Sequence, residues 1–368
     1  MIKVWDYLRE YHAEKHEVQE AISQVLQSGM LILGDNVRNF EAGFARYSGC
    51  QHGVGVNSGT DALFLALRAL DIGPGDEVIT VPNTAVPTVS AIQATGATTR
   101  FVDIDPHTYL MNADQLEAVV TDKTRCILPV HLFGQCVDMD KVRKVAERHS
   151  LKVIEDCAQA HGARQQDNVA GSMSHLSAFS FYPTKILGGF GDGGMILTSS
   201  AELQTRCRRL RFYGMDKQYY SLEQGYNSRL DELHAAILLR KLTHLDDYIA
   251  RRRQLAELYY RELADTELVL PGVADGNFHS YYLFVCRHPK RDFILQYLKE
   301  RNIHLNISYP WPVHTMPAFA QLGYGPGTFP ETEQAAMEIF SLPMFPSLTD
   351  EEAMQTCKAL KEALAQAG

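Results

Sequence analysis

The 368-residue sequence lacks any run of about 18 apolar residues, the length that a membrane-spanning helix needs. Its first residues also lack the charged start and apolar stretch of a secretory signal, so we expect neither export nor membrane insertion. Positive charge is in deficit, since 35 basic residues face 44 acidic ones and the formal net charge is −9. That balance predicts no general attraction to nucleic acid or anionic membranes. Any phosphate that the protein binds must therefore be held by a local site.

Metal-binding and thiol-chemistry patterns are missing as well. The seven cysteines are scattered, odd in number and without a Cys-x-x-Cys pair, which predicts free thiols in a reducing cytosol. The fourteen histidines form no ligand cluster and no His-Glu-x-x-His motif occurs, so we expect no metal site. A P-loop motif and a Gly-x-Ser-x-Gly turn are also absent.

What the sequence does contain is a regular alternation of short apolar runs and helix-like segments. Helix-like segments separate most of the runs, which predicts an α/β fold with a largely parallel sheet and helices on both faces. The gap between residues 181 and 195 is too short and glycine-rich for a crossover helix, so one antiparallel strand is expected there. The seven strand-like runs are 53–56, 78–81, 100–104, 126–131, 152–156, 177–181 and 195–198.

The remaining segments predict an N-terminal arm and a smaller C-terminal unit. Residues 11–28 have a helical pattern, and a capping box at 228–231 predicts the start of long helices that reach about residue 265. After that, strand-like stretches at 279–287 and 303–308, a helix at 291–301 and a final helix from 350 predict an α+β unit. We expect a large domain with its arm at 1–250 and a small domain at 251–368.

A candidate phosphate site lies in the turn Ser58-Gly59-Thr60-Asp61. The turn joins a short strand to an apolar helix, and the N–H groups at a helix N-terminus attract anions. Ser180, at the end of a later strand, can add a hydroxyl. The alternative is ordinary helix capping by Ser58 or Thr60.

A carboxylate and an amide lie at the end of another predicted strand. Asp156 ends the run 152–156, at the sheet edge where ligands of open α/β sheets collect, and can pair with a pyridine nitrogen. Gln159, one turn later, can bond a ring hydroxyl, whereas Glu155 should point to the opposite face of the strand. The alternative for Asp156 is a cap or turn residue.

Lys185 is the most informative residue. It follows a strand, stands beside small flexible residues and has Ser180 and Asp156 upstream, which suits an amine that reaches a bound aldehyde. The aldehyde that fits a phosphate turn, a carboxylate and a lysine is pyridoxal 5'-phosphate. A solvated loop lysine is the alternative. The glycines at 188–194 precede a strand, so they do not form a dinucleotide fingerprint.

Four segments together resemble one family. They are 57–62, 154–163, 179–185 with 191–194, and 225–236. Nearly the whole chain is similar to the nucleotide-sugar aminotransferases of pyridoxal phosphate fold type I, the DegT/DnrJ/StrS family. The resemblance implies a seven-stranded, mostly parallel sheet in the large domain.

The resemblance also implies roles by position. Lys185 would bind the cofactor covalently and move the proton, Asp156 would pair with its ring nitrogen, and Gln159 would contact its ring oxygen. Gly59, Thr60 and Ser180 match the phosphate cradle. Asn227 matches a residue that reaches the phosphate of the neighbouring subunit's cofactor, which implies a homodimer with shared sites. Sugar 3-dehydratases of this fold replace the lysine with histidine, so Lys185 favours amino transfer.

The choice of sugar rests on smaller features. Ala85 stands where many relatives carry an aromatic residue, and His234 stands where glutamine is common. The segment 83–88 is similar to the branch that aminates dTDP-linked 3-keto-6-deoxyhexoses at C-3, with L-glutamate as donor, for O-antigen, S-layer or antibiotic sugars. Amination at C-4 and a non-catalytic cofactor-binding homologue are the alternatives. The C-4 configuration of the product, galacto or gluco, stays open.

Substrate contacts are expected from four further side chains. Tyr182, Arg211 and Tyr213 are candidate wall residues. His314 lies in a proline-rich loop at 309–317 that resembles a family loop near the sugar. A structural histidine is the alternative there. A nicotinamide-dependent sugar oxidoreductase is disfavoured, because 57–62 lacks the Gly-x-Gly-x-x-Gly pattern.

Overall fold

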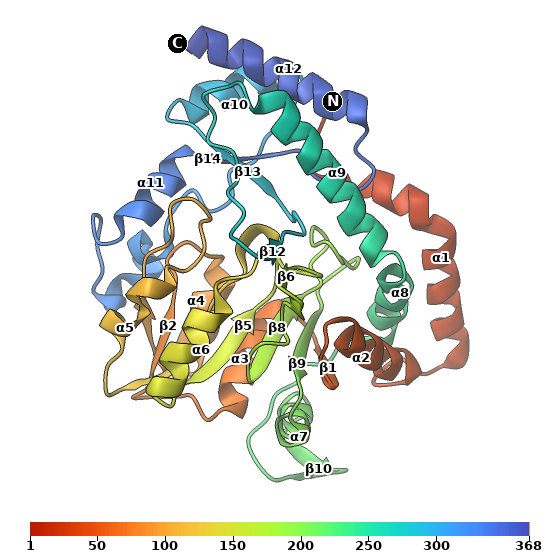
Figure 1. Cartoon of the computed structure of the whole chain (residues 1–368). Helices are drawn as coiled ribbons and strands as arrows, with labels where there is room; N and C mark the ends of the chain where they lie inside the picture. The colour runs from red at the N-terminus through yellow and green to blue at the C-terminus, as the bar shows by residue number, and fades with distance from the viewer. Residues whose placement is uncertain (368) are drawn as a thin grey trace.

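The computed structural model describes residues 1–367 and is built around a seven-stranded sheet (Figure 1). Most strands pair in parallel, whereas β9 is antiparallel to both of its neighbours. The predicted α/β class and the antiparallel strand after residue 181 are therefore confirmed, and the short connection from β8 to β9 is the physical reason. In spatial order the strands are β1 (His52–Val56), β9 (Gly194–Thr198), β8 (Leu176–Ser180), β5 (Lys152–Asp156), β4 (Thr124–Ile127), β2 (Glu77–Thr80) and β3 (Thr98–Phe101).

Helices alternate with these strands, and α2, α3, α4, α6 and α7 contact the sheet directly. The strands that they cover are buried almost throughout, as expected for a sheet with helices packed against it. The helices are α1 (Tyr7–Ser28), α2 (Asp35–Tyr47), α3 (Gly59–Ala69), α4 (Val86–Ala94), α5 (Leu116–Val119), α6 (Met139–Arg148), α7 (Ala201–Leu210), α8 (Glu232–Leu242), α9 (Leu245–Leu263), α10 (Arg291–Lys299), α11 (Pro330–Glu338) and α12 (Asp350–Ala367).

One predicted helix start is wrong. The sequence pattern placed a capping box at residues 228–231, but α8 begins at Glu232 and its N-cap Asp231 makes no side-chain cap bond. The Ser228 hydroxyl instead lies 3.0 Å from Asn57 Oδ1, in the turn before α3. The Ser228 side chain, which the local pattern predicted to cap the helix, therefore makes a long-range hydrogen bond instead.

The C-terminal part contains a second, smaller sheet. Strand β13 (Phe284–Arg287) pairs antiparallel with β14 (Ile339–Leu342), which the sequence pattern did not identify. The predicted strand at 303–308 is wrong, because that segment makes only single bridges, Ile303 to Ile2 and Asn306 to Ser341. β14 is buried along its whole length, and 303–308 is mostly half-buried, so burial favours β14 as the partner.

Three short pairings complete the strands, two of them in one sheet. β6 (Arg164–Gln165) pairs with β7 (Asn168–Val169) and with β12 (Asn277–Phe278), and β10 (Met215–Lys217) pairs with β11 (Tyr220–Ser221). β12 lies far along the chain from β6, so this small sheet joins the C-terminal part to the loop after β5 (Figure 1).

Two hydrophobic clusters meet along α9. Leu245 and Ile249 belong to the cluster around the large sheet, whereas Leu255 and Leu263 belong to the cluster of the C-terminal part. The predicted domain boundary at residue 250 falls inside this helix, and the division into 1–250 and 251–368 stays a prediction. Ile2 packs in the C-terminal cluster, although it lies at the start of the chain.

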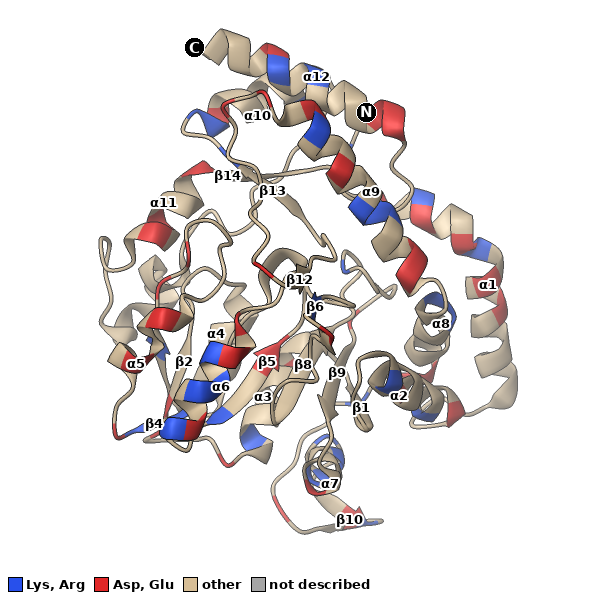
Figure 2. Ribbon diagram, in the orientation of Figure 1, with Lys and Arg blue, Asp and Glu red and all other residues tan. Residues whose placement is uncertain are grey.

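The N-terminal helix α1 ties the two parts together. Acidic and basic residues are mixed along it (Figure 2), and Arg9 pairs with Glu352 of α12 at 2.7 Å while Glu14 pairs with Lys241 of α8 at 2.9 Å. The Tyr7 ring packs edge-on against Phe190, in the loop that follows Lys185. The arm therefore supports that loop from outside.

The seven cysteines are all free and buried. Within residues 1–367, no helix combines the length and the apolar composition that crossing a bilayer requires.

Candidate functional site

The candidate residues come together at one edge of the large sheet. Asp156 and Ser180 are the last residues of the parallel neighbours β5 and β8, so both lie at the carboxyl ends of their strands. The turn before α3 reaches the same edge, because a Cβ added to Gly59 would stand 2.6 Å from the Ser180 Cβ. Lys185 follows β8 directly.

The turn at the start of α3 has the form of an anion site. Ser58 caps the helix and accepts from Asp61 N–H at 3.1 Å, so the capping alternative also holds. The first N–H groups, at Gly59 and Thr60, have no partner within the helix and are available to an anion. A Cβ on Gly194 would lie 2.2 Å from Ser58 O, so close backbone approach at this turn requires glycine.

Asp156 is almost fully buried, at 4% exposure. Its Oδ2 accepts from the Thr88 hydroxyl at 2.8 Å and its Oδ1 from Ala158 N–H at 3.1 Å. Burial raises the pKa of the Asp156 carboxyl, and these two donors together with the Lys185 charge oppose that rise. A cationic partner, such as a protonated ring nitrogen, would stabilise the ionised carboxylate further.

Gln159 has its amide orientation fixed from two sides. Phe133 N–H donates to Oε1 at 2.8 Å, and Nε2 donates to the Tyr309 hydroxyl. These two bonds fix the direction of the Nε2 donor, which suits a hydrogen bond to a ring oxygen. Phe133 and Tyr309 both have left-handed backbone, with φ of 60° and 63°, a strained conformation for aromatic residues that is common at functional sites. Sequence reasoning missed Phe133 and included Tyr309 only as the first residue of the loop 309–317.

Lys185 is half-buried with its ammonium over an aromatic face. Nζ lies 4.5 Å from the centroid of the Tyr282 ring, whose hydroxyl is 3.0 Å from Thr184 Oγ1. Among residues 1–367, no carboxylate stands within ion-pair distance of Lys185. The amine is thus positioned without being held in a salt bridge. Tyr282 is another residue that the sequence did not indicate.

The wall behind Lys185 carries an uncharged histidine. His161 is fully buried and packs against the rings of Phe44, Phe179 and Phe181. Burial, with the Lys185 charge as a smaller cause, lowers the pKa of His161 to about 3. The imidazole therefore stays neutral near neutral pH and adds no charge beside the lysine.

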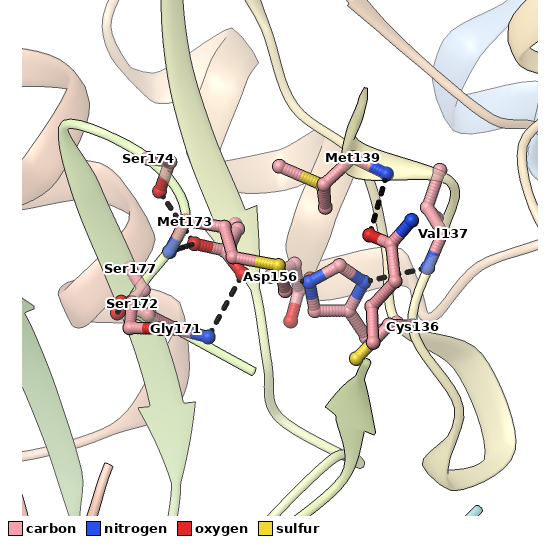
Figure 3. Close-up of polar contacts among 12 residues, drawn as sticks. Cys136, Val137, Met139, Asp156, Gly171, Ser172, Met173, Ser174 and Ser177 are labelled. Atoms are coloured by element: carbon pink, nitrogen blue, oxygen red, sulfur yellow. Dashed lines mark hydrogen bonds and ion pairs between the residues drawn. The ribbon is translucent and has the colours of Figure 1, made fainter. Parts of the chain in front are cut away.

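Glu155 anchors a buried network on the opposite face of β5 from Asp156. Its two carboxylate oxygens accept from Gly171 N–H, Met173 N–H, the Ser174 hydroxyl and His131 Nε2–H, all at 2.8 to 2.9 Å. Figure 3 shows Gly171, Met173 and Ser174 gathered on one side and Val137 on the other.

The same network explains a cluster that has metal-ligand chemistry. His131, Glu155 and Cys157 place one ligand atom each within 4.8 Å of one another. His131 Nδ1 already accepts from Val137 N–H at 3.1 Å, so Nε2 carries the proton that Glu155 accepts. Both imidazole nitrogens and both carboxylate oxygens are committed to protein partners, which favours a structural role.

The candidate substrate residues divide into two groups. Tyr182 and Tyr213 are 52% and 40% exposed and keep free surface, and Ala85 is half-buried at the N-cap of α4. Arg211 and His314 are instead buried against protein partners, and their role as substrate contacts stays a prediction. Arg211 is buried against Glu41 at 2.5 Å and Gly55 O at 2.7 Å, because its charge needs a partner inside the fold.

The contacts of His314 favour the structural alternative, and its contact with the sugar stays a prediction. It is 1% exposed, its Nε2 lies 3.1 Å from Glu333 Oε1, and its ring packs edge-on against Phe329. These contacts fix the proline-rich loop rather than present an imidazole at the surface.

Asn227 is exposed next to the phosphate turn. Its neighbour Ser228 bonds Asn57, and residue 227 itself bridges to Phe212. An exposed amide at this place is free to reach beyond its own chain.

The residues present fit pyridoxal phosphate by their chemistry. Unpaired N–H groups at a helix start suit a phosphate, a buried carboxylate suits a cationic nitrogen, an oriented amide suits a ring oxygen, and an amine without an ion pair suits an aldehyde.

The chain is similar in sequence to known aminotransferases. The model of the DegT/DnrJ/EryC1/StrS aminotransferase family matches residues 12–361. A dTDP-3-amino-3,4,6-trideoxy-alpha-D-glucose transaminase of Micromonospora megalomicea subsp. nigra is 52% identical over 98% of both chains. A dTDP-3-amino-3,6-dideoxy-alpha-D-galactopyranose transaminase of Aneurinibacillus thermoaerophilus is 44% identical over 94% of both.

Solved structures agree in fold. That of S. venezuelae DesV in complex with a ketimine intermediate has a TM-score of 0.95 and 43% identity, covering 97% of this chain and 96% of that one. The Bacillus subtilis NtdA structure, with bound cofactor PMP, has a TM-score of 0.90 and 31% identity, covering 96% and 82%.

Proposed function

The chain belongs to the DegT/DnrJ/EryC1/StrS aminotransferase family, and we propose that it aminates carbon 3 of a dTDP-linked 3-keto-6-deoxyhexose. It is a sugar aminotransferase of pyridoxal phosphate fold type I, with pyridoxal 5'-phosphate as its cofactor. The observation that carries the choice of substrate is the 52% identity, over nearly the full length, to a transaminase of a dTDP-3-amino sugar. L-Glutamate is the proposed amino donor.

The residues divide the work of the reaction. The N–H groups at the start of α3 and the Ser180 hydroxyl hold the phosphate, and Asp156 and Gln159 orient the ring through its nitrogen and oxygen. The bound cofactor supplies a ring that accepts the electron pair left when a proton leaves the neighbouring carbon. Lys185 Nζ takes that proton and returns it to a second carbon, first for the amino donor and then, in reverse order, for the keto sugar.

The product follows from the same proposal. It is a dTDP-3-amino-3,6-dideoxyhexose of galacto or gluco configuration, for O-antigen and other lipopolysaccharide sugars, S-layer glycans or antibiotics. A cytoplasmic location is proposed with it, because seven buried free thiols suit a reducing compartment.

The substrate is tested by following nitrogen. The purified protein is incubated with ¹⁵N-labelled L-glutamate and either a 3-keto or a 4-keto dTDP-6-deoxyhexose, and the sugar nucleotides are analysed by mass spectrometry. We expect ¹⁵N in the product of the 3-keto sugar and release of 2-oxoglutarate. Faster transfer to the 4-keto sugar would overturn the choice of carbon 3. No transfer to either would favour a non-catalytic cofactor-binding protein.

We also propose a homodimer in which Asn227 completes the phosphate site of the partner subunit. The exposed position of Asn227 supports this, as do large apolar side chains left in solvent, with Met30 54%, Leu31 50% and Tyr219 87% exposed.

Subunit mixing tests the shared site. Lys185→Ala and Asn227→Ala are each expected to be impaired as homodimers, but their mixed dimer contains one site with both native residues. Random 1:1 reassociation should therefore restore about a quarter of wild-type turnover, since half of the dimers carry one native site of two. A mixture with no more activity than the sum of its parents would contradict the shared site, and light scattering gives the dimer mass independently.

A further inference from the structure

We propose that Thr88 is a positioning residue for Asp156. The Thr88 hydroxyl, supported by Thr84, keeps the Asp156 carboxylate ionised and aimed at the cofactor ring nitrogen. The inference rests on the proposed pairing of Asp156 with that nitrogen. It also gives the segment 83–88, which the sequence linked only to the choice of sugar, a role in the chemistry.

The geometry starts from two elements that are distant in the chain. Asp156 ends β5, and Thr88 lies in the first turn of α4, which follows β2. Thr88 Oγ1 is 2.8 Å from Asp156 Oδ2, and Thr84 Oγ1 is 2.9 Å from Thr88 Oγ1. Thr88 and Thr84 are only 1% and 2% exposed, so bulk water has little access to replace a lost hydroxyl.

The direction of the hydrogen bonds follows from the carboxylate. An ionised Asp156 can only accept, so Thr88 donates to it, and the Thr88 oxygen then accepts from Thr84. Each donor polarises the next, which strengthens the final bond to the carboxylate. The first turn of α4 adds the positive end of a helix dipole at the same place.

The need for these donors comes from burial. Desolvation raises the pKa of Asp156 and favours its neutral form, which cannot stabilise a protonated ring nitrogen. The Ala158 N–H and the Thr88 hydroxyl oppose that rise, and Lys185 and His131 are the ionisable groups that act on Asp156 in the same direction. The Ala158 donor is a backbone N–H, which a side-chain substitution leaves in place. The Thr88 hydroxyl is the donor that a substitution can remove.

The test compares three variants of the cofactor-loaded, full-length protein. Thr88→Val removes the hydroxyl and keeps the shape, and Thr88→Ser restores the hydroxyl. Thr80→Val is the matched control, because Thr80 is also a buried threonine, but its hydroxyl bonds Leu128 O at 2.8 Å and not Asp156. The dissociation constant for pyridoxal phosphate is measured by equilibrium dialysis from pH 5 to 9.

We expect Thr88→Val to weaken cofactor binding at least about tenfold, as for a lost hydrogen bond to a charged group. As the pH is lowered, the cofactor affinity of Thr88→Val should begin to fall at a higher pH than that of the wild type. Without the Thr88 hydroxyl, the pKa of Asp156 is higher and the carboxylate is protonated at a higher pH. Thr88→Ser and Thr80→Val should keep the wild-type constant within about threefold.

Two outcomes would overturn the inference. One is a Thr88→Val protein with wild-type affinity and pH profile, and the other is a Thr88→Ser protein as weak as Thr88→Val, since packing and not the hydroxyl would then matter. If Thr88→Val does not fold, Thr84→Val must show a smaller weakening in the same direction, or the inference fails. Nitrogen transfer by the wild-type protein is measured separately, so failure of the proposed function is distinguishable from failure of this inference.

Discussion

Lys185→Ala is expected to lower turnover at least about 10⁴-fold, because it removes the amine that we propose both attaches the cofactor and moves the proton. The variant should also lose the visible absorption of lysine-bound pyridoxal phosphate. The free energy of unfolding should change little, since Lys185 is half-buried and, among residues 1–367, has no ion pair to break. Steady-state assays, absorption spectra and denaturation curves of the same preparation measure the three effects.

Two further variants sharpen this prediction. Lys185→Arg keeps the positive charge near the Tyr282 ring but offers no amine of suitable basicity, so it should be as inactive as alanine. Lys358→Ala, on the exposed side of α12, is the matched control and should be fully active. Robust turnover by either variant at position 185 would rule out the role given to this lysine.

The largest loss of stability is expected from Glu155→Ala. Four donors point at this fully buried carboxylate, one from His131 and three from Gly171, Met173 and Ser174, which Figure 3 labels. Alanine leaves them without an acceptor and opens a cavity, so the free energy of unfolding should fall by about 3–5 kcal/mol. Urea unfolding of the loaded protein, followed by circular dichroism, measures the change.

A surface glutamate provides the comparison. Glu147 is exposed near the end of α6, and Glu147→Ala should change the free energy of unfolding by no more than about 0.5 kcal/mol. Glu155→Gln should fall between the two, because its amide oxygen still accepts while its NH₂ group faces donors. A loss below about 1 kcal/mol for Glu155→Ala would mean that water or rearranged loops satisfy the network.

The two faces of β5 have different partners. Asp156 faces the site with Thr88, and Glu155 faces the loop 171–174 and His131. The alternation of side chains along a strand made this division predictable from sequence. The partners on each face were not predictable, because they come from other segments.

Sequence reasoning was reliable where chemistry and structure are local. Lys185, Asp156 and the turn at 58–61 follow strands that short apolar runs reveal, and parallel strands bring their carboxyl ends to one edge. It was unreliable where a residue has two local uses. The local pattern predicts Ser228 as a helix cap, but its hydroxyl bonds Asn57. The pattern also predicts a strand at 303–308, but β14 is the strand that pairs with β13.

The sequence by itself determined the strands of the large sheet, the family resemblance and the candidate site residues, because apolar period and motif spacing are properties of neighbouring residues. Only the tertiary structure decided which side chains surround them. Thr88 lies 68 residues from Asp156, and Tyr309 lies 150 residues from Gln159. The same folding buried Arg211 and His314 against their own partners. Such contacts depend on burial and on the packing of distant segments, which no local pattern contains.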